Sequence, residues 1–507
     1  MACLRTRLAF ECHCSSSTQR FKMIVFVTLC VLFGGINSSI IESPYDTIVV
    51  GLGAAGATAA STLARAGRHV LALDAQSRVG GRVWTTPFGH GVVEAGAEWI
   101  HGQVHSRVYE LALKRNVSVS LQEPALSARR SDGAALDPPL ADLLRYGLEV
   151  IDEDSDVNEP KGQFVERRLR DYLQTKNPEL LNDKDALDSL FYLLNLVVDS
   201  LEGSNDWNNV TALRGYEQLQ GTQSGSFHRY GYKTFLEILL NTYDDGLGLP
   251  TLNKWLNEEV TTVEWSDSGV VVACADGRRY SADNVIVTVS LGVLKERHSS
   301  LFSPPLPQDK VSAIELLPMG LVNKIILQFK KSRPAEGYML FYWTPEDRRL
   351  VPEEDKWITQ VVGLSAPSGS YNTLTLWVLG EAAKLVETLP EEVIKAKAVE
   401  LLQRFLGSDI RVSHPVAMIR TTWYSNPFTR GSYSYDNVEV AKHPGLRATL
   451  AAPLSAGGAP RVLFAGEATD PTHYATVHGA SDSGYREAQR LLSLLPKIKK
   501  AGNGFYH

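Results

Sequence analysis

The sequence predicts an α/β fold with a parallel sheet, because a strand, a helix and a second strand follow one another from residue 47. A short apolar strand, 47–50, precedes an Ala-rich helix that ends near Gly67, and the second strand, 69–73, runs into Asp74. Between the first strand and the helix stand three glycines at G-x-G-x-x-G spacing, Gly51, Gly53 and Gly56. Parallel strands joined by a helix form a βαβ unit, so the stretch predicts a Rossmann-like domain.

The glycines and the acid indicate a dinucleotide site in this unit. Glycines at this spacing allow a tight turn, let backbone N–H groups approach a pyrophosphate and let the helix pack closely on the sheet. Asp74 stands 23 positions after Gly51, near the offset of about 20 residues at which a carboxylate meets ribose hydroxyls. An ordinary Gly-rich turn is the alternative for the glycines alone.

Composition and net charge exclude fewer classes of function than the glycine motif does. With 507 residues, 44% of them hydrophobic and 21% charged, the chain is long enough for two or three globular domains. A formal net charge of −6 without a long basic run argues against nucleic acid as a partner. A mildly acidic surface suits a cationic substrate, although it also provides ordinary solubility.

Residues 1–39 are interpreted as a leader. An apolar run, 24–36, follows Arg20 and Lys22 and is too short to span a bilayer, which takes about 20 apolar residues. The run has the length expected in a signal peptide, with Met23 as an alternative start, so a secreted protein without a stable membrane anchor is expected. A retained anchor and a misread leader are the alternatives.

The cysteines and the glycosylation triplets bear on the expectation of a secreted protein. Four of the five cysteines lie in the leader, so Cys274 remains alone, and neither an intrachain disulfide nor a cysteine-based metal site is expected. We expect no bound metal. Asn116 and Asn209 begin N-x-S/T triplets that would be glycosylated on the secretory route, although such triplets also arise by chance.

Two further motifs carry a resemblance to a known family. Gly80, Gly81 and Arg82 form a glycine-backed loop whose cation can contact phosphate, and the chain closes with FAGEATD at 464–470 and TVHGA at 476–480. In this order, after the glycine fingerprint, the motifs resemble those of the flavin-dependent amine oxidase family. The resemblance covers nearly all of the chain after Pro44.

The resemblance implies FAD as the cofactor, bound without a covalent link. In addition to contacts of the glycines and Asp74, the resemblance implies that Arg82 contacts the phosphates, that the backbone of Glu98 and Trp99 passes along the flavin, and that Val260 lies at the adenine end. It also implies that Glu467 contacts the ribityl or phosphate part, and that the backbone of Thr476 and Val477 meets the pyrimidine edge of the flavin. An ordinary surface arginine is the alternative for Arg82. Monoamine oxidases attach the flavin to a cysteine, and Ser432 stands at that position here.

The same resemblance implies a Rossmann-like FAD-binding domain interleaved with a discontinuous α+β substrate domain. The expected FAD-binding segments are 43–123, 225–305 and 441–495, the expected substrate segments are 124–224 and 306–440, and 496–507 form a tail. Hydrophobic periodicity independently predicts amphipathic helices at 165–173, 187–201 and 393–406, and turn residues predict a β-meander over 260–280.

Lys324 is the residue expected to act in the chemistry. It lies on a predicted strand, 321–329, on the face opposite Ile325, Leu327 and Phe329. An inward-facing lysine is costly unless it is solvated or paired, and an ordinary edge-strand lysine is the alternative. In the family this lysine holds a water against flavin N5, where a cation stabilises developing negative charge.

The substrate pocket of the family is aromatic near the flavin and acidic farther out. Tyr433 matches a tyrosine before the flavin face, but Thr476 stands where monoamine oxidases have a second tyrosine. This departure favours a long polyamine and resembles animal spermine and acetylpolyamine oxidases. His101 matches a histidine that contacts a substrate amine, with a core histidine as the alternative. Glu202 matches an acid for the distal amine, with a solvated loop acid as the alternative.

The sequence is therefore interpreted as that of an FAD-dependent polyamine oxidase. The enzyme would take hydride from the carbon beside a secondary amine of spermine, spermidine or their N-acetyl forms. With dioxygen as acceptor, the products are a shorter polyamine, an aminoaldehyde and hydrogen peroxide. The preferred polyamine, the side of the nitrogen that is cleaved and the oligomeric state are left open.

Other enzyme classes and a non-enzymatic module are alternative interpretations of the sequence. A monoamine oxidase or an L-amino-acid oxidase would share the fold, and the latter needs an arginine for the substrate carboxylate, for which Arg430 is the candidate. A flavin-fold binding module of the Rab-escort kind would lack oxidase chemistry, and Lys324 and Tyr433 argue against it. The leader and the lack of a long helical insertion disfavour a chromatin amine oxidase. The final GFYH differs from the S-K-L signal of peroxisomal relatives.

Overall fold

A computed structural model describes residues 45–121, 126–213 and 215–494 of the chain. The expected leader and the expected tail lie outside the described residues. Within the described ranges, no helix is both long enough and apolar enough to cross a membrane.

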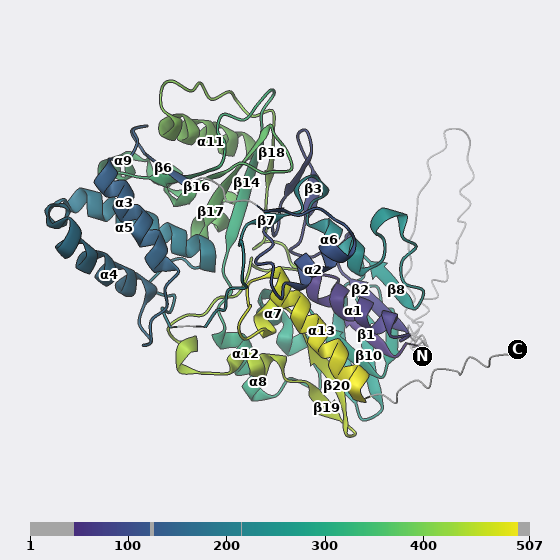
Figure 1. Ribbon diagram of the computed structural model, residues 1–507. Helices are drawn as coiled ribbons and strands as arrows, with labels where there is room; N and C mark the ends of the chain where they lie inside the picture. The colour runs from purple at the N-terminus through teal and green to yellow at the C-terminus, as the bar shows by residue number, and fades with distance from the viewer. Residues whose placement is uncertain (1–44, 122–125, 214, 495–507) are drawn as a thin grey trace, which may run out of the picture. The chain divides into compact units, whose positions relative to one another are not determined.

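The predicted βαβ unit begins a six-stranded sheet (Figure 1). In spatial order the strands are β19 (Leu454–Ala456), β20 (Ala459–Phe464), β12 (Asn284–Val287), β1 (Thr47–Val50), β2 (Val70–Asp74) and β8 (Leu252–Leu256). All neighbours from β20 to β8 pair in parallel, whereas β19 pairs antiparallel to β20. β1 and β2 are buried along their whole length, as expected for a parallel sheet covered on both faces. The predicted α/β fold class is confirmed.

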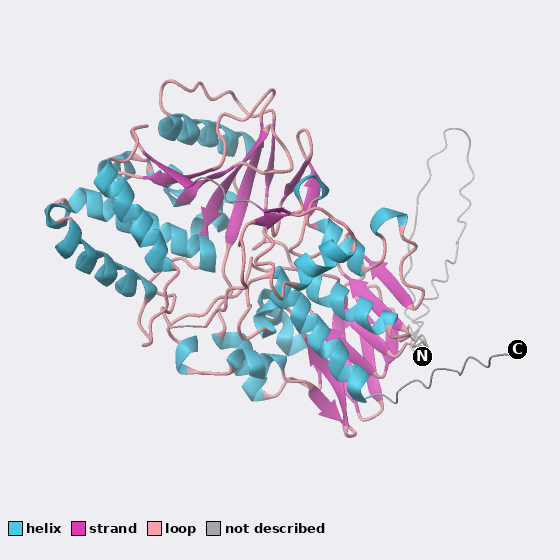
Figure 2. Cartoon of the chain, in the orientation of Figure 1, coloured by secondary structure: helices cyan, strands magenta, loops and turns pink. Residues whose placement is uncertain are grey.

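Two helices from opposite ends of the described chain cover this sheet together. α1 (Ala54–Arg65) packs along α13 (Val477–Leu494), and Figure 2 shows both as part of the helical layer over the strands. Gly484 permits the approach, because a Cβ there would lie 2.1 Å from the carbonyl oxygen of Ala55. Gly56 fits equally closely beneath the turn, since its Cβ would lie 1.9 Å from the carbonyl oxygen of Gly51. Packing by itself therefore requires glycine at position 56.

The predicted β-meander forms a second sheet. Its strands lie in the order β11 (Arg279–Ala282), β10 (Gly269–Cys274), β9 (Val260–Ser266) and β13 (Phe302–Ser303). The first three pair antiparallel through short turns, as the sequence predicts. α7 (Leu291–Leu301) packs against β9.

A third sheet carries Lys324. Its strands lie in the order β18 (Ala417–Arg420), β14 (Val322–Gln328), β17 (Thr373–Leu379), β16 (Val361–Ser365), β15 (Tyr338–Tyr342) and β6 (Leu126–Arg130). All pairs are antiparallel except β15 with β6. α5 (Lys184–Glu202) packs on β15, β16 and β17, while α10 (Gly380–Val386) contacts β14 and β17.

The predicted amphipathic helices are present in the structure. They lie within α4 (Lys161–Lys176), α5 and α11 (Glu391–Leu406), and Gly407 caps α11 with a φ of 78°. α3 (Pro138–Ile151) packs against both α4 and α5. The residue boundaries between an FAD-binding and a substrate domain stay a prediction.

The remaining elements are short. They are β3 (Thr85–Pro87), β4 (Val92–Glu94), β5 (Ser120–Leu121), β7 (Gly225–Ser226), α2 (Arg107–Lys114), α6 (Lys233–Leu239), α8 (Gln308–Leu316), α9 (Pro345–Leu350) and α12 (Leu446–Ala451). The 3₁₀ helices are η1 (Pro178–Asn182), η2 (His228–Tyr230), η3 (Tyr243–Asp245), η4 (Glu353–Gln360), η5 (Val440–Lys442) and η6 (Glu467–Thr469).

Two alanine substitutions in the glycine turn test whether Gly56 is needed for packing in the absence of a ligand. We expect Gly56→Ala to lower the free energy of unfolding of the ligand-free protein by about 3 kcal/mol, since the new methyl group overlaps backbone. Gly53→Ala is the matched control, because its Cβ would lie 3.7 Å from the nearest neighbouring atom, at ordinary contact distance. Denaturant unfolding measures both changes. Equal stability of the two variants would contradict the packing role of Gly56.

Candidate active site

One cavity of about 1280 Å³ collects nearly all of the residues singled out from the sequence. The following predicted positions line it: Gly51, Gly53, Asp74, Arg82, Glu98, Trp99, His101, Glu202, Val260, Lys324, Tyr433, Glu467, Thr476 and Val477. Gly56 does not line the cavity, because it packs under the turn. The cavity begins at the carboxyl ends of β1 and β2, where ligands of open α/β sheets bind.

The glycine turn and Asp74 together provide the donor and acceptor groups that a dinucleotide needs. Gly53 caps α1 without a side-chain hydrogen bond, so N–H groups of the first helical turn remain available to an anion. Asp74 is buried and accepts hydrogen bonds from the backbone N–H groups of Leu52 and Gln76, at 2.7 and 2.8 Å. Burial raises the pKa of Asp74 above its ordinary value, and these two hydrogen bonds oppose that shift. The turn therefore fits a pyrophosphate followed by a ribose.

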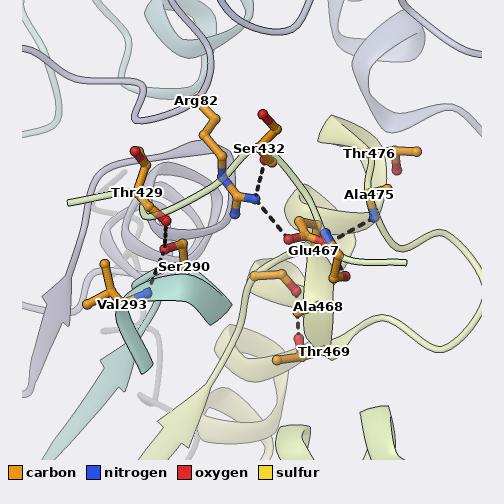
Figure 3. Close-up of polar contacts among 12 residues, drawn as sticks. Arg82, Ser290, Val293, Thr429, Ser432, Glu467, Ala468, Thr469, Ala475 and Thr476 are labelled. Atoms are coloured by element: carbon orange, nitrogen blue, oxygen red, sulfur yellow. Dashed lines mark hydrogen bonds and ion pairs between the residues drawn. The ribbon is translucent and has the colours of Figure 1, made fainter. Parts of the chain in front are cut away.

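Arg82 and Glu467 both line the cavity and form an ion pair (Figure 3). Arg82 Nη1 lies 2.9 Å from Glu467 Oε1 and donates to the carbonyl oxygen of Ser432 at 2.8 Å. Glu467 Oε2 accepts from Ser434 Oγ at 2.6 Å and from the Ala475 N–H at 2.9 Å. Burial alone would raise the pKa of Glu467, but the Arg82 charge and these hydrogen bonds lower it below the ordinary value. Glu467 is thus a buried carboxylate held in its charged form.

Thr476 acts in the structure as the cap of α13. Its hydroxyl donates to the carbonyl oxygen of His473 at 2.6 Å and accepts from the Gly479 N–H at 3.0 Å. A side-chain oxygen in this place satisfies a free N–H of the first helical turn. Thr476 therefore has a local structural role of its own, and its match to the position of the second cage tyrosine stays a prediction.

Lys324 lies on β14 directly opposite Trp377 of β17, and its Nζ stands 4.4 Å from the centre of that ring. The ammonium donates to Glu98 Oε2 at 2.7 Å and to the carbonyl oxygens of Glu94 and Gly96, both at 3.0 Å. Lys324 is thus a buried and paired lysine, and the edge-strand alternative does not fit, because β14 pairs with a strand on each side. Its expected contact with a water at flavin N5 stays a prediction.

Glu202 lies at the C-terminal end of α5, in the part of the cavity lined by tyrosines and acids. Within the described residues, no hydrogen bond or ion pair to its carboxylate is present. Burial, and then the charge of Asp436, raise the pKa of Glu202 to about 7. The charge of Glu202 in turn adds to burial in raising the pKa of Tyr216 to about 12. A cationic group entering this region would favour the ionised form of Glu202.

His101 and Tyr433 complete the set of predicted substrate residues. The Tyr433 hydroxyl donates to the carbonyl oxygen of Ser200 at 2.8 Å, which fixes the ring at the cavity wall. Burial lowers the pKa of His101, against a raising effect of a hydrogen bond with the Gln223 backbone, so its imidazole is neutral at physiological pH. Both side chains line the cavity, but their contacts with substrate stay predictions.

Lys161, Tyr338, Trp377 and Asp436 are among the lining residues of the cavity that sequence reasoning missed. Lys161 is a buried cation whose Nζ donates to the carbonyl oxygen of Glu153 at 2.6 Å. Its position at the first turn of α4 gave no signal, because a lysine at a helix end is normally solvated. The spacing of the β-strands could have identified Trp377 only if the pairing partner of β14 had been known.

Arg430, the candidate carboxylate clamp of an amino-acid oxidase, lies outside the cavity lining. Its guanidinium pairs with Glu296, with Nε 2.6 Å and Nη2 2.8 Å from the two carboxylate oxygens. The structure therefore does not favour this alternative.

Comparison with solved structures supports the fold. A redesigned putrescine oxidase matches with a TM-score of 0.64 over 88% of this chain and 99% of its own, at 20% sequence identity. Two curated relatives are the peroxisomal N(1)-acetyl-spermine/spermidine oxidases of Homo sapiens and Bos taurus, 32% and 30% identical. The human match covers 89% of this chain and 96% of the relative, and the bovine match covers 88% and 94%.

These relatives correct the expectation of secretion. Both are named as peroxisomal enzymes, which contradicts a secreted location for this chain. The apolar run at 24–36 was the basis of the error, because an apolar stretch of that length is compatible with several uses besides a signal peptide. The signal peptide is unsupported, and the glycosylation of Asn116 and Asn209 loses its premise. The difference between the final GFYH and an S-K-L signal therefore does not separate this chain from peroxisomal relatives.

The family itself is shown by a match that spans most of the chain. The model described as "Flavin containing amine oxidoreductase" matches residues 54–492, which include Gly56, Lys324 and the Arg82–Glu467 pair. The cavity geometry fits a flavin dinucleotide, since the glycine turn, the acid at the end of β2 and the paired arginine all line one space. The chain belongs to the flavin containing amine oxidoreductase family, and its cofactor is FAD.

Proposed function

We propose that the protein is an FAD-dependent polyamine oxidase. The observation that carries the proposal is Glu202, an acid without a described hydrogen-bond partner in the same cavity as Lys324 and the glycine turn. The charges of Lys161 and Arg447 act on this carboxylate, but burial still raises its pKa, so a further cation that binds there would stabilise the ionised form. The names of the relatives, which refer to acetylated spermine and spermidine, support the same substrate class.

The residues of the chain would share the work as follows. FAD supplies the hydride acceptor for the carbon beside the amine nitrogen. Tyr433 would form an aromatic wall beside the reacting carbon, and Glu202 would hold an ammonium group farther along the polyamine. Neutral His101 can accept a hydrogen bond from a substrate amine. Lys324 would stabilise negative charge that develops on the ring system.

One assay tests the proposal directly. Hydrogen peroxide release should be measured with spermine, spermidine, an N-acetylated polyamine, benzylamine and free leucine. We expect the highest kcat/KM with one of the three polyamines. Faster turnover of benzylamine or leucine would refute the assignment.

Glu202→Gln should weaken polyamine binding without affecting small amines. We expect KM for the best polyamine to rise about tenfold at pH 8, which corresponds to about 1.4 kcal/mol. Because the pKa of Glu202 is about 7, wild-type kcat/KM should increase as the pH rises through 7 and the carboxylate ionises. This step should be absent in the variant.

Two comparisons control the Glu202 experiment. Glu217 lines the cavity but is exposed, so Glu217→Gln should change KM much less, because water screens its charge. Benzylamine has no distal ammonium, and its turnover should be the same in wild type and Glu202→Gln. A tenfold loss with benzylamine would show that Glu202 is not an anchor for the distal amine.

Lys324→Met should slow turnover while the protein keeps its FAD. Loss of one preorganised charge contact costs about 3 kcal/mol, which is roughly a hundredfold in rate. Stopped-flow rates of flavin reduction and reoxidation measure the loss, and the visible spectrum reports bound FAD. Wild-type rates in the FAD-bound variant would exclude a role for Lys324 in the chemistry.

FAD should be released intact when the protein is denatured. Ser432 occupies the position where a cysteine would form the covalent link, and its hydroxyl donates to the carbonyl oxygen of Val322 at 2.8 Å. Cys274, the one cysteine among the described residues, is buried and does not line the cavity. Acid precipitation should therefore leave a colourless pellet and a yellow supernatant. Flavin retained in the pellet would contradict the prediction.

A further inference from the structure

The ammonium of Lys324 has no free N–H group in this structure. Its three N–H donors match three protein acceptors, the carbonyl oxygens of Glu94 and Gly96 and the Oε2 atom of Glu98. A water or another acceptor can bind Lys324 only if one of these hydrogen bonds breaks. Lys324 is therefore held in one place rather than free to follow a ligand.

Glu98 is the charged member of this set of acceptors. The side chains of Lys324 and Glu98 are 5% and 7% exposed, so water screens their interaction poorly. The other two acceptors are neutral carbonyl oxygens, and the ring of Trp377 covers the ammonium from the neighbouring strand. A carboxylate at 2.7 Å therefore compensates most of the positive charge that the cavity would otherwise experience.

Glu94 cannot substitute for Glu98 in this role. Its carboxylate accepts from Thr85 Oγ1 at 2.8 Å and from the Tyr232 N–H at 2.8 Å, and only its backbone carbonyl oxygen contacts Lys324. Burial raises the pKa of Glu94 to about 7, so this group carries only part of a charge at neutral pH. The carboxylate in direct contact with the ammonium is that of Glu98.

We propose that Glu98 is a positioning residue that tethers Lys324 and, through it, sets the reduction potential of the bound FAD. A cation beside the flavin favours the reduced form, which carries more negative charge, and a carboxylate bound to that cation weakens the effect. Glu98 thus keeps the potential lower than a free lysine would. The inference depends on FAD binding near Lys324 and not on which amine is oxidised.

The experiment measures the two-electron potential of the FAD-bound protein by anaerobic titration with a reference dye. Glu98→Gln keeps the shape and an acceptor oxygen but removes the charge. We expect reduction to become at least tenfold more favourable, which corresponds to a rise of about 30 mV. Glu237→Gln removes a surface charge from an i,i+4 pair with Lys233 and should leave the potential unchanged.

A double-mutant cycle tests whether Glu98 acts through the lysine. In a Lys324→Met background the additional Glu98→Gln change should have a much smaller effect on the potential, because the part that depends on the position of the ammonium is gone. An unchanged potential in Glu98→Gln, or an equal rise with and without Lys324, would overturn the proposal. These outcomes are independent of the polyamine assignment, because no amine substrate is used.

Glu98→Asp gives a second measurement if Glu98→Gln does not retain FAD. Aspartate keeps the charge but is one methylene shorter, so it should hold the ammonium less closely. We expect a smaller rise of the potential in the same direction. An unchanged or lower potential in this variant would also overturn the proposal.

Discussion

The architecture around the cavity depends on the buried carboxylate of Glu467. Its partners Arg82, Ser434 and Ala475 come from three segments that are far apart in the sequence. Removing one partner from a buried ion pair typically costs about 3–5 kcal/mol, because the other charge stays behind without compensation. Arg82 is 24% exposed on its side chain, so water would reduce this cost here. Even so, the carboxylate holds together the glycine-backed loop, the segment that contains Ser434 and the residues just before α13.

Charge is compensated in a different way at the Lys324 end of the cavity. Arg82 can pair with Glu467 and still present its remaining N–H groups to an anion, because a guanidinium has five of them. An ammonium has three, and Lys324 uses all three on the protein. The cavity therefore contains two cations of different kinds. Arg82 is available to bind a ligand directly, whereas Lys324 acts on a ligand through its charge alone unless one of its hydrogen bonds to the protein breaks.

The local patterns of the sequence predicted the fold well, because they depend on neighbouring residues. Glycine spacing, a period of 3.6 in α4, α5 and α11, and short turns between β9 and β10 are each visible within one stretch. The partners of the site residues were not visible. Lys324 and Glu98 are 226 positions apart, and the sequence assigned only the backbone of Glu98 to the site. Pairing across such a distance follows from the register of strands, which local periodicity does not determine.

The cavity has an aromatic wall even though threonine stands at position 476, where the sequence predicted the place of a second cage tyrosine. Thr476 uses its hydroxyl to cap α13, a hydrogen-bonding pattern that tyrosine, with its hydroxyl far from the backbone, would not reproduce. Aromatic surface is supplied by Trp99, Tyr338 and Trp377, and the rings of Trp99 and Tyr338 pack with centres 5.7 Å apart. These residues stand on the third sheet and on the loop beside Lys324, whereas Thr476 begins α13. Glu202, at the end of α5, lines the same cavity as these rings, so aromatic surface and an acid face one space, as the binding of a long, flexible cation requires.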